Sequence, residues 1–416
     1  MTRRMKDSGV EWIGEIPESW DVVKFKNIGT YINGYAFKPE DWTTNGKKIV
    51  RIQDLTGSND NPNFYDGIID EKYNIQRGDY LISWAATLDA FIWDNDDAWL
   101  NQHIFKAIPK NNVTNKFFFW LIKESMQNMN NENKHGIMMQ HVTLSVFNNF
   151  NIPLPPKNEQ QKIANYLDEK CSAIDEVIAK TEQSVEEYKK LKQSVITEAI
   201  TKGIRPNRKM KSSGVEWIGD IPEKWNVRKL FQVFTQVKNK NQGMVETNLL
   251  SLSYGKIKQK NIETSFGLLP ESFETYNIID KNDIVLRLTD LQNDQKSLRV
   301  GLSTQRGIIT SAYVTMRAKN PHMAPYLYYL LHTFDIEKGF YGMGDGVRQG
   351  LNWDELKHLS FVLPPLSEQK EIADYLDKKC AEIDSLIEKK QQFLTELAIY
   401  KKSMIYEYVT GKKEVA

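Results

Sequence analysis

The chain has 416 residues, of which 40% are hydrophobic and 26% charged, and its formal net charge at pH 7 is +1. This composition is typical of a globular protein, and the near-zero charge excludes a uniformly basic nucleic-acid-binding chain. No run of roughly eighteen apolar residues predicts a membrane span, and the first residues lack the apolar stretch of a secretory signal. The only two cysteines, Cys171 and Cys380, argue against a disulfide framework and favour a reducing compartment, the cytoplasm.

A stretch of sequence near the start of the chain occurs twice. The stretch "GVEWIGEIPESW" (9–20) recurs as "GVEWIGDIPEKW" (214–225). A second stretch, "LPPKNEQQKIANYLDEKCSAID", ends at Asp175 and recurs as "LPPLSEQKEIADYLDKKCAEID", which ends at Asp384. The segments between these stretches, 21–150 and 226–360, are almost unrelated. A repeat of this length far exceeds the about 20–50 residues of a solenoid unit, so it predicts a duplicated domain with internal pseudo-symmetry.

The divergent segment 21–150 contains strand-like runs and one helical run. The strand-like runs are "KKIVRIQDL", "GDYLISWAA" and "HIFKAI", and the helical run is "KFFFWLIKESMQ". The second divergent segment, 226–360, repeats this order with "ETNLLSLSYG", "NDIVLRLTD" and "SAYVTMRA" before "APYLYYLLHTF". Each segment therefore predicts an α+β globule of a size usual for a domain.

A long helix is predicted after each globule. Asn158 and Ser367 are predicted as N-cap residues, and Gly203 and Gly411 suit the C-terminal ends. Steps of three and four between apolar residues predict a coiled-coil seam, and each helix of about 44 residues needs a long partner. An ordinary bundle helix is the alternative, but the other copy is the obvious partner, and packing about a pseudo-twofold axis makes the pair antiparallel. The predicted packing residues are Ile163, Leu167, Ile174, Ile178, Ile372, Leu376, Ile383 and Ile387.

Some loops of the two globules combine basic, amide and aromatic residues, namely 33–42 and 101–105 in the first globule and 254–260 and 344–350 in the second. Arg and Lys contact phosphates or guanine, and Asn and Gln pair with adenine edges, so these loops are candidates for DNA contact. Solvated loops with aromatic residues at the edge of a core are the alternative. The candidate DNA-binding residues are Tyr35, Lys38, Gln102, His103, Gln140, Lys256, Lys258, Lys260, Arg348 and Gln349.

Catalytic motifs are missing from the sequence. There is no G-x-x-x-x-G-K-[ST] phosphate loop, no G-x-G-x-x-G cofactor loop, and the six histidines show no metal-ligand spacing. We therefore predict no catalytic residue and no metal site in this chain, and a role in recognition and assembly.

The combination of motifs resembles the specificity subunit of type I restriction-modification systems. The residues that carry the resemblance are "WIGEIPESW" and "WIGDIPEKW", the "LPP…EQ" joints, the two long helices, "GYAFKPEDW", "LNQHIF" and "GVRQGLNW". The resemblance covers essentially the whole chain. It implies a non-catalytic subunit in which each of two target-recognition domains binds one half of a bipartite double-stranded DNA target, and the helices set the distance between the halves.

The resemblance also implies partners. Two methyltransferase subunits that use S-adenosylmethionine dock on the specificity subunit, and two restriction and translocase subunits use ATP and magnesium. This chain is expected to bind none of these cofactors and no membrane. A coiled-coil assembly scaffold with protein-binding flanking domains is the alternative function.

The expected fold is α+β, with two pseudo-symmetric repeats, each an α/β target-recognition globule followed by a long helix. The two long helices are expected to form an antiparallel coiled coil. The predicted divisions are residues 1–156 for the first recognition domain, 157–203 for the first spacer helix, 204–365 for the second recognition domain, and 366–416 for the second spacer helix with the C-terminal tail.

Overall fold

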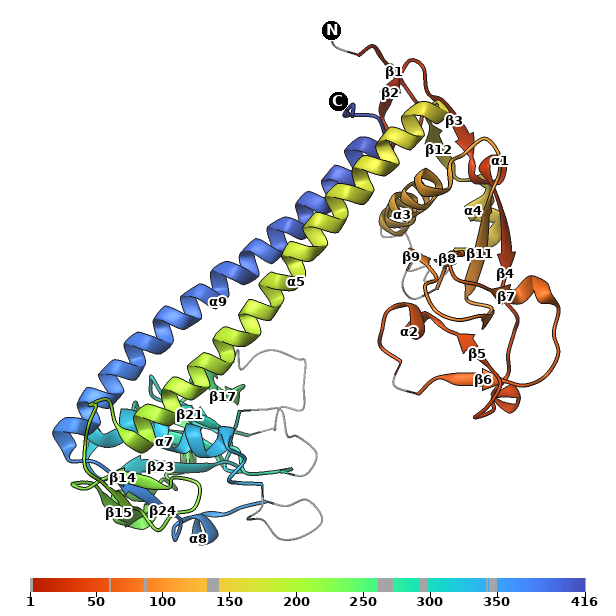
Figure 1. The fold of residues 1–416 in the computed structure, drawn as a ribbon. Helices are drawn as coiled ribbons and strands as arrows, with labels where there is room; N and C mark the ends of the chain where they lie inside the picture. Colours follow the sequence, from red (N-terminus) through yellow and green to blue (C-terminus); the bar gives the residue numbers. More distant parts are fainter. Residues whose placement is uncertain are drawn as a thin grey trace. The chain divides into compact units, whose positions relative to one another are not determined.

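The computed structural model describes residues 3–59, 61–85, 88–132, 142–260, 272–291, 298–341, 343 and 350–415, the side chains of 130–132 excepted. The chain forms two compact units. Unit 1 comprises Met1–Thr181 and Gln392–Ala416, and unit 2 comprises Glu182–Gln391. Each long helix passes through both units (Figure 1). Within the described residues, no helix is both long and apolar enough to cross a membrane.

Unit 1 is built on a four-stranded antiparallel sheet with the order β4-β11-β8-β9, against which helix α3 packs through β9. A second sheet has the order β6-β5-β10-β7, and two-stranded pairs join β1 to β2 and β3 to β12. The elements are β1 (Met5–Asp7), β2 (Glu15–Pro17), β3 (Asp21–Lys24), α1 (Phe25–Ile28), β4 (Gly29–Asn33), η1 (Pro39–Asp41), β5 (Lys47–Val50), α2 (Ile52–Leu55), β6 (Asn63–Tyr65), η2 (Glu71–Tyr73), β7 (Asn74–Ile75), β8 (Tyr80–Ser83), β9 (Asp89–Ile92), β10 (Ala98–Leu100), β11 (Ile104–Pro109), α3 (Asn115–Glu132), α4 (Leu144–Asn149) and β12 (Asn151–Leu154).

Unit 2 repeats this arrangement with an unrelated sequence. Its four-stranded antiparallel sheet has the order β16-β23-β20-β21, and helix α7 packs against β21 as α3 packs against β9. The pairs β13-β14 and β15-β24 correspond to β1-β2 and β3-β12, and two further pairs are β17-β18 and β19-β22. The elements are β13 (Met210–Ser212), β14 (Asp220–Pro222), β15 (Asn226–Lys229), α6 (Leu230–Val233), β16 (Phe234–Gln236), η4 (Gln242–Met244), β17 (Leu250–Ser253), β18 (Lys256–Gln259), β19 (Asn277–Ile279), β20 (Ile284–Leu286), β21 (Val300–Leu302), β22 (Gly307–Ile309), β23 (Val314–Ala318), η5 (Pro321–Met323), α7 (Ala324–Ile336), α8 (Trp353–Leu356) and β24 (Ser360–Leu363).

The two long helices are α5 (Lys157–Lys202) and α9 (Leu366–Val409). In unit 1 the first half of α5 pairs with the last half of α9, and Lys401 Nζ lies 2.5 Å from Asp175 Oδ1. In unit 2 the end of α5 pairs with the start of α9, and Lys192 Nζ lies 2.6 Å from Asp384 Oδ2. These two ion pairs occupy equivalent positions of the repeat. The helices therefore form an antiparallel coiled coil, as predicted.

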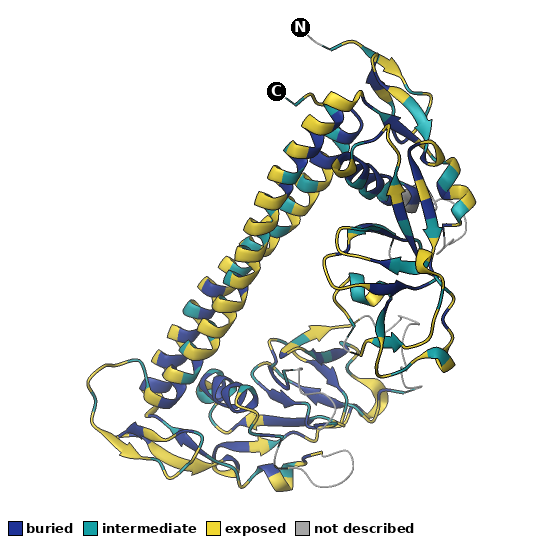
Figure 2. Cartoon of the chain, turned by 45° about the vertical axis from the view of Figure 1, so that its right-hand side comes forward, coloured by how far each residue is buried: buried dark blue, intermediate teal, exposed yellow. Residues whose placement is uncertain are grey.

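Buried and exposed residues alternate along both long helices (Figure 2), and the predicted packing residues are among the buried or half-buried ones. In unit 1, some of them belong to a buried cluster with Met404, Ile405 and Val409 of α9. Five of the eight are buried (Ile163, Leu167, Ile372, Leu376 and Ile383), and three are half-buried (Ile174, Ile178 and Ile387).

The ends of the long helices differ slightly from the prediction. Gly203 and Gly411 have positive φ angles of 77° and 74°, as a C-terminal glycine requires. At the other end, α5 begins at Lys157, so the N-cap position falls on Pro156, and the prediction of Asn158 as the N-cap was wrong by two residues. The carbonyl of Pro156 accepts the backbone N–H groups of Glu159 and Gln160, so the helix starts directly after the proline pair. Ser367 of α9 is likewise inside the helix.

The repeated phrases form the joint between each globule and its helices. Trp20 and Trp225 are both fully buried, and Trp20 Nε1 donates to Glu159 Oε2 at 2.8 Å. In unit 2, Arg208 donates to the equivalent carboxylate, Glu368. Burial raises the pKa of Glu368, but its hydrogen bonds, with that from Arg208 foremost, bring the pKa below its ordinary value. The joint thus holds a nearly buried carboxylate in its charged form.

Candidate nucleic-acid interface

Two loops singled out from the sequence, 33–42 and 101–105, lie against each other in unit 1. The Tyr35 N–H donates to the Leu100 carbonyl at 2.8 Å, and the Gly34 N–H donates to the Ile104 carbonyl at 3.1 Å. A Cβ atom on Gly34 would lie only 2.1 Å from the backbone oxygen of Asn101, so only glycine permits this approach. The two loops therefore form a single candidate surface.

Tyr35 and Lys38 have different environments in this surface. The ring of half-buried Tyr35 packs on Phe37, with centroids 4.9 Å apart, and on Tyr73, with centroids 5.5 Å apart. Lys38 is exposed, and its Nζ reaches only 4.0 Å from Glu40. The structure thus places the Tyr35 ring on a small aromatic core and leaves the Lys38 ammonium group in solvent, where it can reach a phosphate.

Gln102 and His103 lie beside a tryptophan that the sequence reasoning missed. The His103 ring lies 5.5 Å from the ring of Trp84, and Trp84 Nε1 donates to Asn33 Oδ1 at 3.3 Å. The side-chain oxygen of half-buried Gln102 is itself buried and has no hydrogen-bond partner among the described residues. Trp84 follows strand β8, and a large aromatic residue just beyond a strand end was a signal that could have identified it.

The three candidates Gln140, Arg348 and Gln349 lie outside the described residues. The chain just after them is described in both units and makes equivalent contacts. Val142 N–H donates to the Trp84 carbonyl at 3.0 Å, and Leu351 N–H donates to the Leu288 carbonyl at 2.9 Å. In each unit, a capped short helix follows, since Thr143 caps α4 and Asn352 caps α8.

In unit 2, Lys256, Lys258 and Lys260 lie on or just after the second strand of a hairpin. Tyr254 and Gly255 form its two-residue turn, with φ angles of 47° and 74°, as a type I′ turn requires. Lys256 and Lys258 point to the exposed face, because side chains alternate along a strand. The three lysines are therefore spaced along one edge of the hairpin, and the exposed Tyr254 ring is at its tip.

Arg299, which the sequence reasoning also missed, holds the backbone segment 287–290 of unit 2. Its side chain is fully buried, and its guanidinium donates to the carbonyls of Arg287 at 3.1 Å and Thr289 at 2.9 Å. Its Nε donates to the Tyr341 hydroxyl at 3.1 Å. Leu288, which receives the N–H of Leu351, lies within the segment that Arg299 supports. One buried arginine thus holds the backbone segment 287–290, to which Leu351 is hydrogen-bonded.

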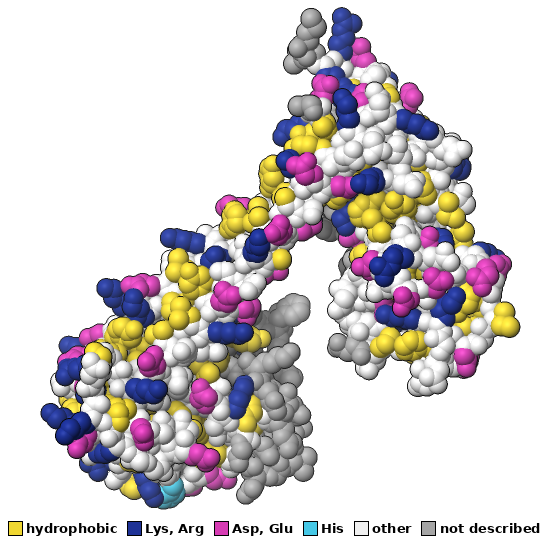
Figure 3. Space-filling model, viewed as in Figure 1, with side chains coloured by type: hydrophobic (Ala, Val, Ile, Leu, Met, Phe, Trp, Pro, Cys, Tyr) yellow, Lys and Arg dark blue, Asp and Glu magenta, His cyan; other side chains and the backbone are white. Residues whose placement is uncertain are grey.

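Charges on the surface are interspersed. Figure 3 shows basic and acidic side chains mixed across the visible face. In unit 2, Arg306 pairs with Glu246 and Asp280, and Arg317 pairs with Asp280 and Asp283. Because these arginines are already paired with carboxylates, the lysines of the hairpin are better candidates for phosphate contact than the arginines of the sheet.

Comparisons with known proteins give one consistent result. The family model for the type I restriction modification DNA specificity domain matches the chain twice, over residues 17–187 and 222–396. The type I restriction enzyme EcoBI specificity subunit of Escherichia coli is 21% identical, over 92% of this chain and 84% of its own length. The MjaVIII specificity subunit of Methanocaldococcus jannaschii is 24% identical, over 96% of this chain and 94% of its own.

Solved structures support the fold. A chain from a structural study of complex assembly and conformational transition of the type I R-M system aligns with a TM-score of 0.69 at 16% identity, over 96% of this chain and 99% of that one. The crystal structure of the HsdS subunit from Thermoanaerobacter tengcongensis aligns with a TM-score of 0.50 at 17% identity, over 96% of this chain and 98% of that one. The two family matches span most of the sequence, and the chain therefore belongs to the type I restriction-modification DNA specificity family.

Proposed function

We propose that this chain is the DNA specificity subunit of a type I restriction-modification complex in which each globule binds one half of a bipartite double-stranded DNA target. The observation that carries the proposal is the contrast between the two repeats. The same strand order is built from unrelated residues in the two globules, while the joints keep the same tryptophans and carboxylates. Two globules that share a strand arrangement but differ in their loops can recognise two different half-target sequences.

The proposed recognition domains are residues 1–156 and 204–365, and the spacers are residues 157–203 and 366–416. The subunit itself is proposed to be non-catalytic. Two methyltransferase subunits supply S-adenosylmethionine chemistry, and two restriction subunits supply ATP-dependent translocation and cleavage. The long helices set the distance between the half-targets, because a helix of 46 residues is about 69 Å long at 1.5 Å per residue.

Apolar side chains on the outside of the long helices support docking of the methyltransferase subunits there. In unit 1, Val177, Ile399 and Tyr400 are 42%, 65% and 57% exposed, and a shallow groove of about 190 Å³ runs beside them. In unit 2, Leu191 and Leu386 are similarly exposed. Figure 3 shows such side chains along the coiled coil. Exposed apolar side chains that gather on one surface mark sites of protein association.

A domain graft tests the proposal. Strand β3 pairs with β12 in the register Asp21 to Leu154, so a graft that replaces residues 25–150 with those of another specificity subunit keeps both joint strands native. We expect genomic methylation mapping in the host to show one half-target changed and the other intact. The reciprocal graft of residues 230–359, between β15 and β24, should change only the other half. A change in both half-targets with either graft would contradict modular recognition.

Single substitutions separate the two kinds of proposed contact. For Lys258→Ala we expect weaker binding to all DNA sequences alike and a salt dependence reduced by about one phosphate contact. For Gln102→Ala we expect a loss of about 1–3 kcal/mol that is confined to one base position. Binding of the assembled methyltransferase complex to matched and mismatched duplexes at several salt concentrations measures both. Loss of base preference with Lys258→Ala would reverse the assignment.

A further inference from the structure

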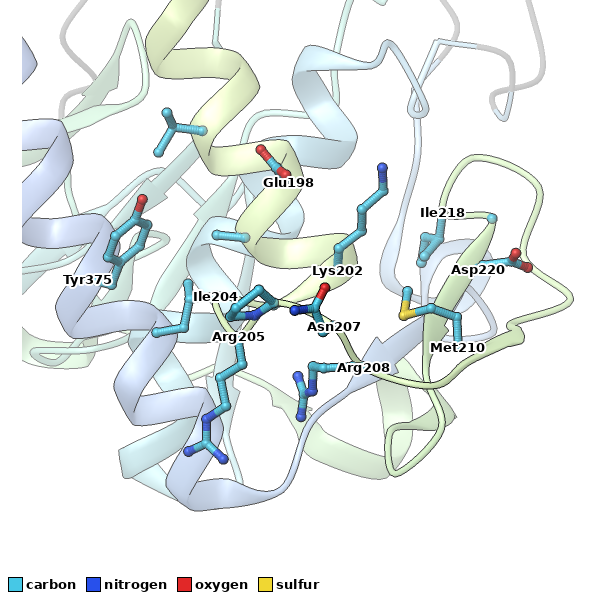
Figure 4. A pocket seen from close by; sticks show the side chains of 15 residues that line it. Glu198, Lys202, Ile204, Arg205, Asn207, Arg208, Met210, Ile218, Asp220 and Tyr375 are labelled. Carbon is cyan, nitrogen blue, oxygen red and sulfur yellow. The ribbon is translucent and has the colours of Figure 1, made fainter.

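Unit 2 contains an open pocket of about 900 Å³ at its helix joint (Figure 4). Ala199 of α5 and Tyr375 of α9 line it together with Ile204 of the following linker and Ile218 of the repeated phrase. Its volume is within the range of about 300–1,000 Å³ that is usual for ligand sites. Apart from the linker after α5, the lining belongs to the long helices and the repeated phrase, which both repeats contain, so these parts can be compared with unit 1.

The corresponding place in unit 1 is occupied by the chain itself. Tyr166 is the equivalent of Tyr375, and Tyr408 is the equivalent of Ala199, since both pairs are 209 positions apart (375 − 166 and 408 − 199). The rings of Tyr166 and Tyr408 lie with centroids 4.4 Å apart. Their hydrogen bond, together with burial, raises the pKa of Tyr408 to about 12. Unit 2 has the small, buried Ala199 at this position, beside the pocket, so no ring from α5 fills the place there.

This place in unit 2 has the chemistry of an aromatic side-chain site. Tyr375 is 37% exposed and lines the pocket, so part of its side chain is accessible to an incoming ring. Around the apolar lining, Lys202, Arg205 and Asp220 supply charged groups, and Figure 4 shows that these come from α5, the linker and the repeated phrase. Arg205 already pairs with Glu371 at 2.5 Å, in an exposed position where this contact is readily exchanged.

We infer that this pocket receives an aromatic side chain of the methyltransferase subunit that docks on unit 2. The inference rests on the proposed function, which assigns the repeated helices and phrases to methyltransferase docking, and the pocket is continuous with those parts. The contact of the Tyr408 ring with the Tyr166 ring in unit 1 indicates that an aromatic ring fits the equivalent place in unit 2. Because the Tyr408 ring lies at the equivalent position in unit 1, the two identical methyltransferase copies meet two different sites, and the copy on unit 2 gains an anchor at the pocket.

The first test variant places a larger side chain of the chain itself at the pocket. Ala199→Tyr gives unit 2 the residue that unit 1 has, and we expect binding of one methyltransferase copy to weaken by about thirtyfold, as for loss of an interface hot spot. The other copy should bind as before.

Tyr375→Ala removes the aromatic ring on which the partner side chain would stack, and it should weaken binding of the same copy by about tenfold. This second variant keeps the test valid if the larger side chain at position 199 impairs folding. Titration of the full-length chain with the methyltransferase subunit, followed by native mass spectrometry, resolves the two binding steps.

Thr304→Tyr adds the same side chain to an exposed position between β21 and β22 that lies on neither long helix and does not line the pocket, and this variant should bind both copies normally. If folded Ala199→Tyr and Tyr375→Ala bind both copies as the wild type does, or if both copies weaken equally, the inference is overturned while the proposed function stands. An effect on DNA binding or on self-association alone also overturns it. If the wild-type chain binds no methyltransferase subunit, the proposed function fails, and the inference fails with it.

Discussion

Replacement of Arg299 with methionine is expected to lower the free energy of unfolding by about 4 kcal/mol or more. The Arg299 guanidinium donates to the carbonyls of Arg287, Thr289 and Asp290 and to the Tyr341 hydroxyl, and the side chain is fully buried. Methionine fills much of the volume but donates nothing, so several buried acceptors lose their donor, and each such loss costs about 1–3 kcal/mol. Urea denaturation followed by circular dichroism measures the change.

Arg306→Met is the matched control for this substitution. Arg306 likewise donates side-chain hydrogen bonds, in its case to the carboxylates of Glu246 and Asp280, but 56% of its side chain is exposed. Exposed ion pairs contribute about 0–1 kcal/mol, so this variant should unfold close to the wild type. Equal effects of the two substitutions would show that burial of Arg299 does not determine the stability of unit 2.

Acidification is expected to destabilise unit 2 through His332. Only 9% of this side chain is exposed, its Nδ1 has no hydrogen-bond partner among the described residues, and the Tyr328 ring stacks at 5.7 Å. Burial first, and then the charge of Lys192, lower the pKa of His332 to about 4. The folded state therefore favours neutral His332, whereas the unfolded chain takes up the proton near the ordinary value of about 6.5. The neutral His332 ring therefore contributes its full stabilisation at pH values above about 6.5, and this contribution is lost as the pH falls toward 4.

The expected loss is about 3 kcal/mol between pH 7 and pH 4, because each unit of pKa shift corresponds to about 1.4 kcal/mol. His332→Leu removes the titrating group and keeps an apolar side chain of similar size. Carboxylates titrate in both proteins, so the difference between the two stability curves isolates the histidine. Parallel curves across this pH range would exclude the expected role of His332.

The long helices and their joints could be predicted because their signals are local or repeated. The apolar steps of three and four, the glycines at 203 and 411, and the duplicated tryptophans all act within a few turns of chain or occur twice. The start of α5 was missed by two residues, since the sequence does not show which carbonyl accepts the first helical N–H. The Pro156 carbonyl accepts it, two positions before Asn158.

The recognition surface was only partly predictable because its strands are short and their pairing is not local. The loops at 33–42 and 101–105 were identified by composition, but nothing in the sequence indicated that they touch. Trp84 was missed because its partner Asn33 lies far along the chain, and Arg299 was missed because most of its acceptors are backbone carbonyls, which residue types do not indicate. Tyr35, chosen as an aromatic loop residue, packs its ring on Phe37 and Tyr73. Residue type alone does not distinguish a ring that supports a loop from one that faces DNA.

The close backbone approach at Gly34 limits how this protein could be redesigned. Any side chain there would collide with the Asn101 carbonyl and separate the two loops of the candidate surface. A combinatorial library aimed at new target sequences could therefore randomise Lys38, Gln102 and His103 freely, but clones altered at Gly34 should be lost during selection. Evolution of new specificities would meet the same limit, because side chains can be exchanged on this frame while the crossing point of the two loops has to remain glycine.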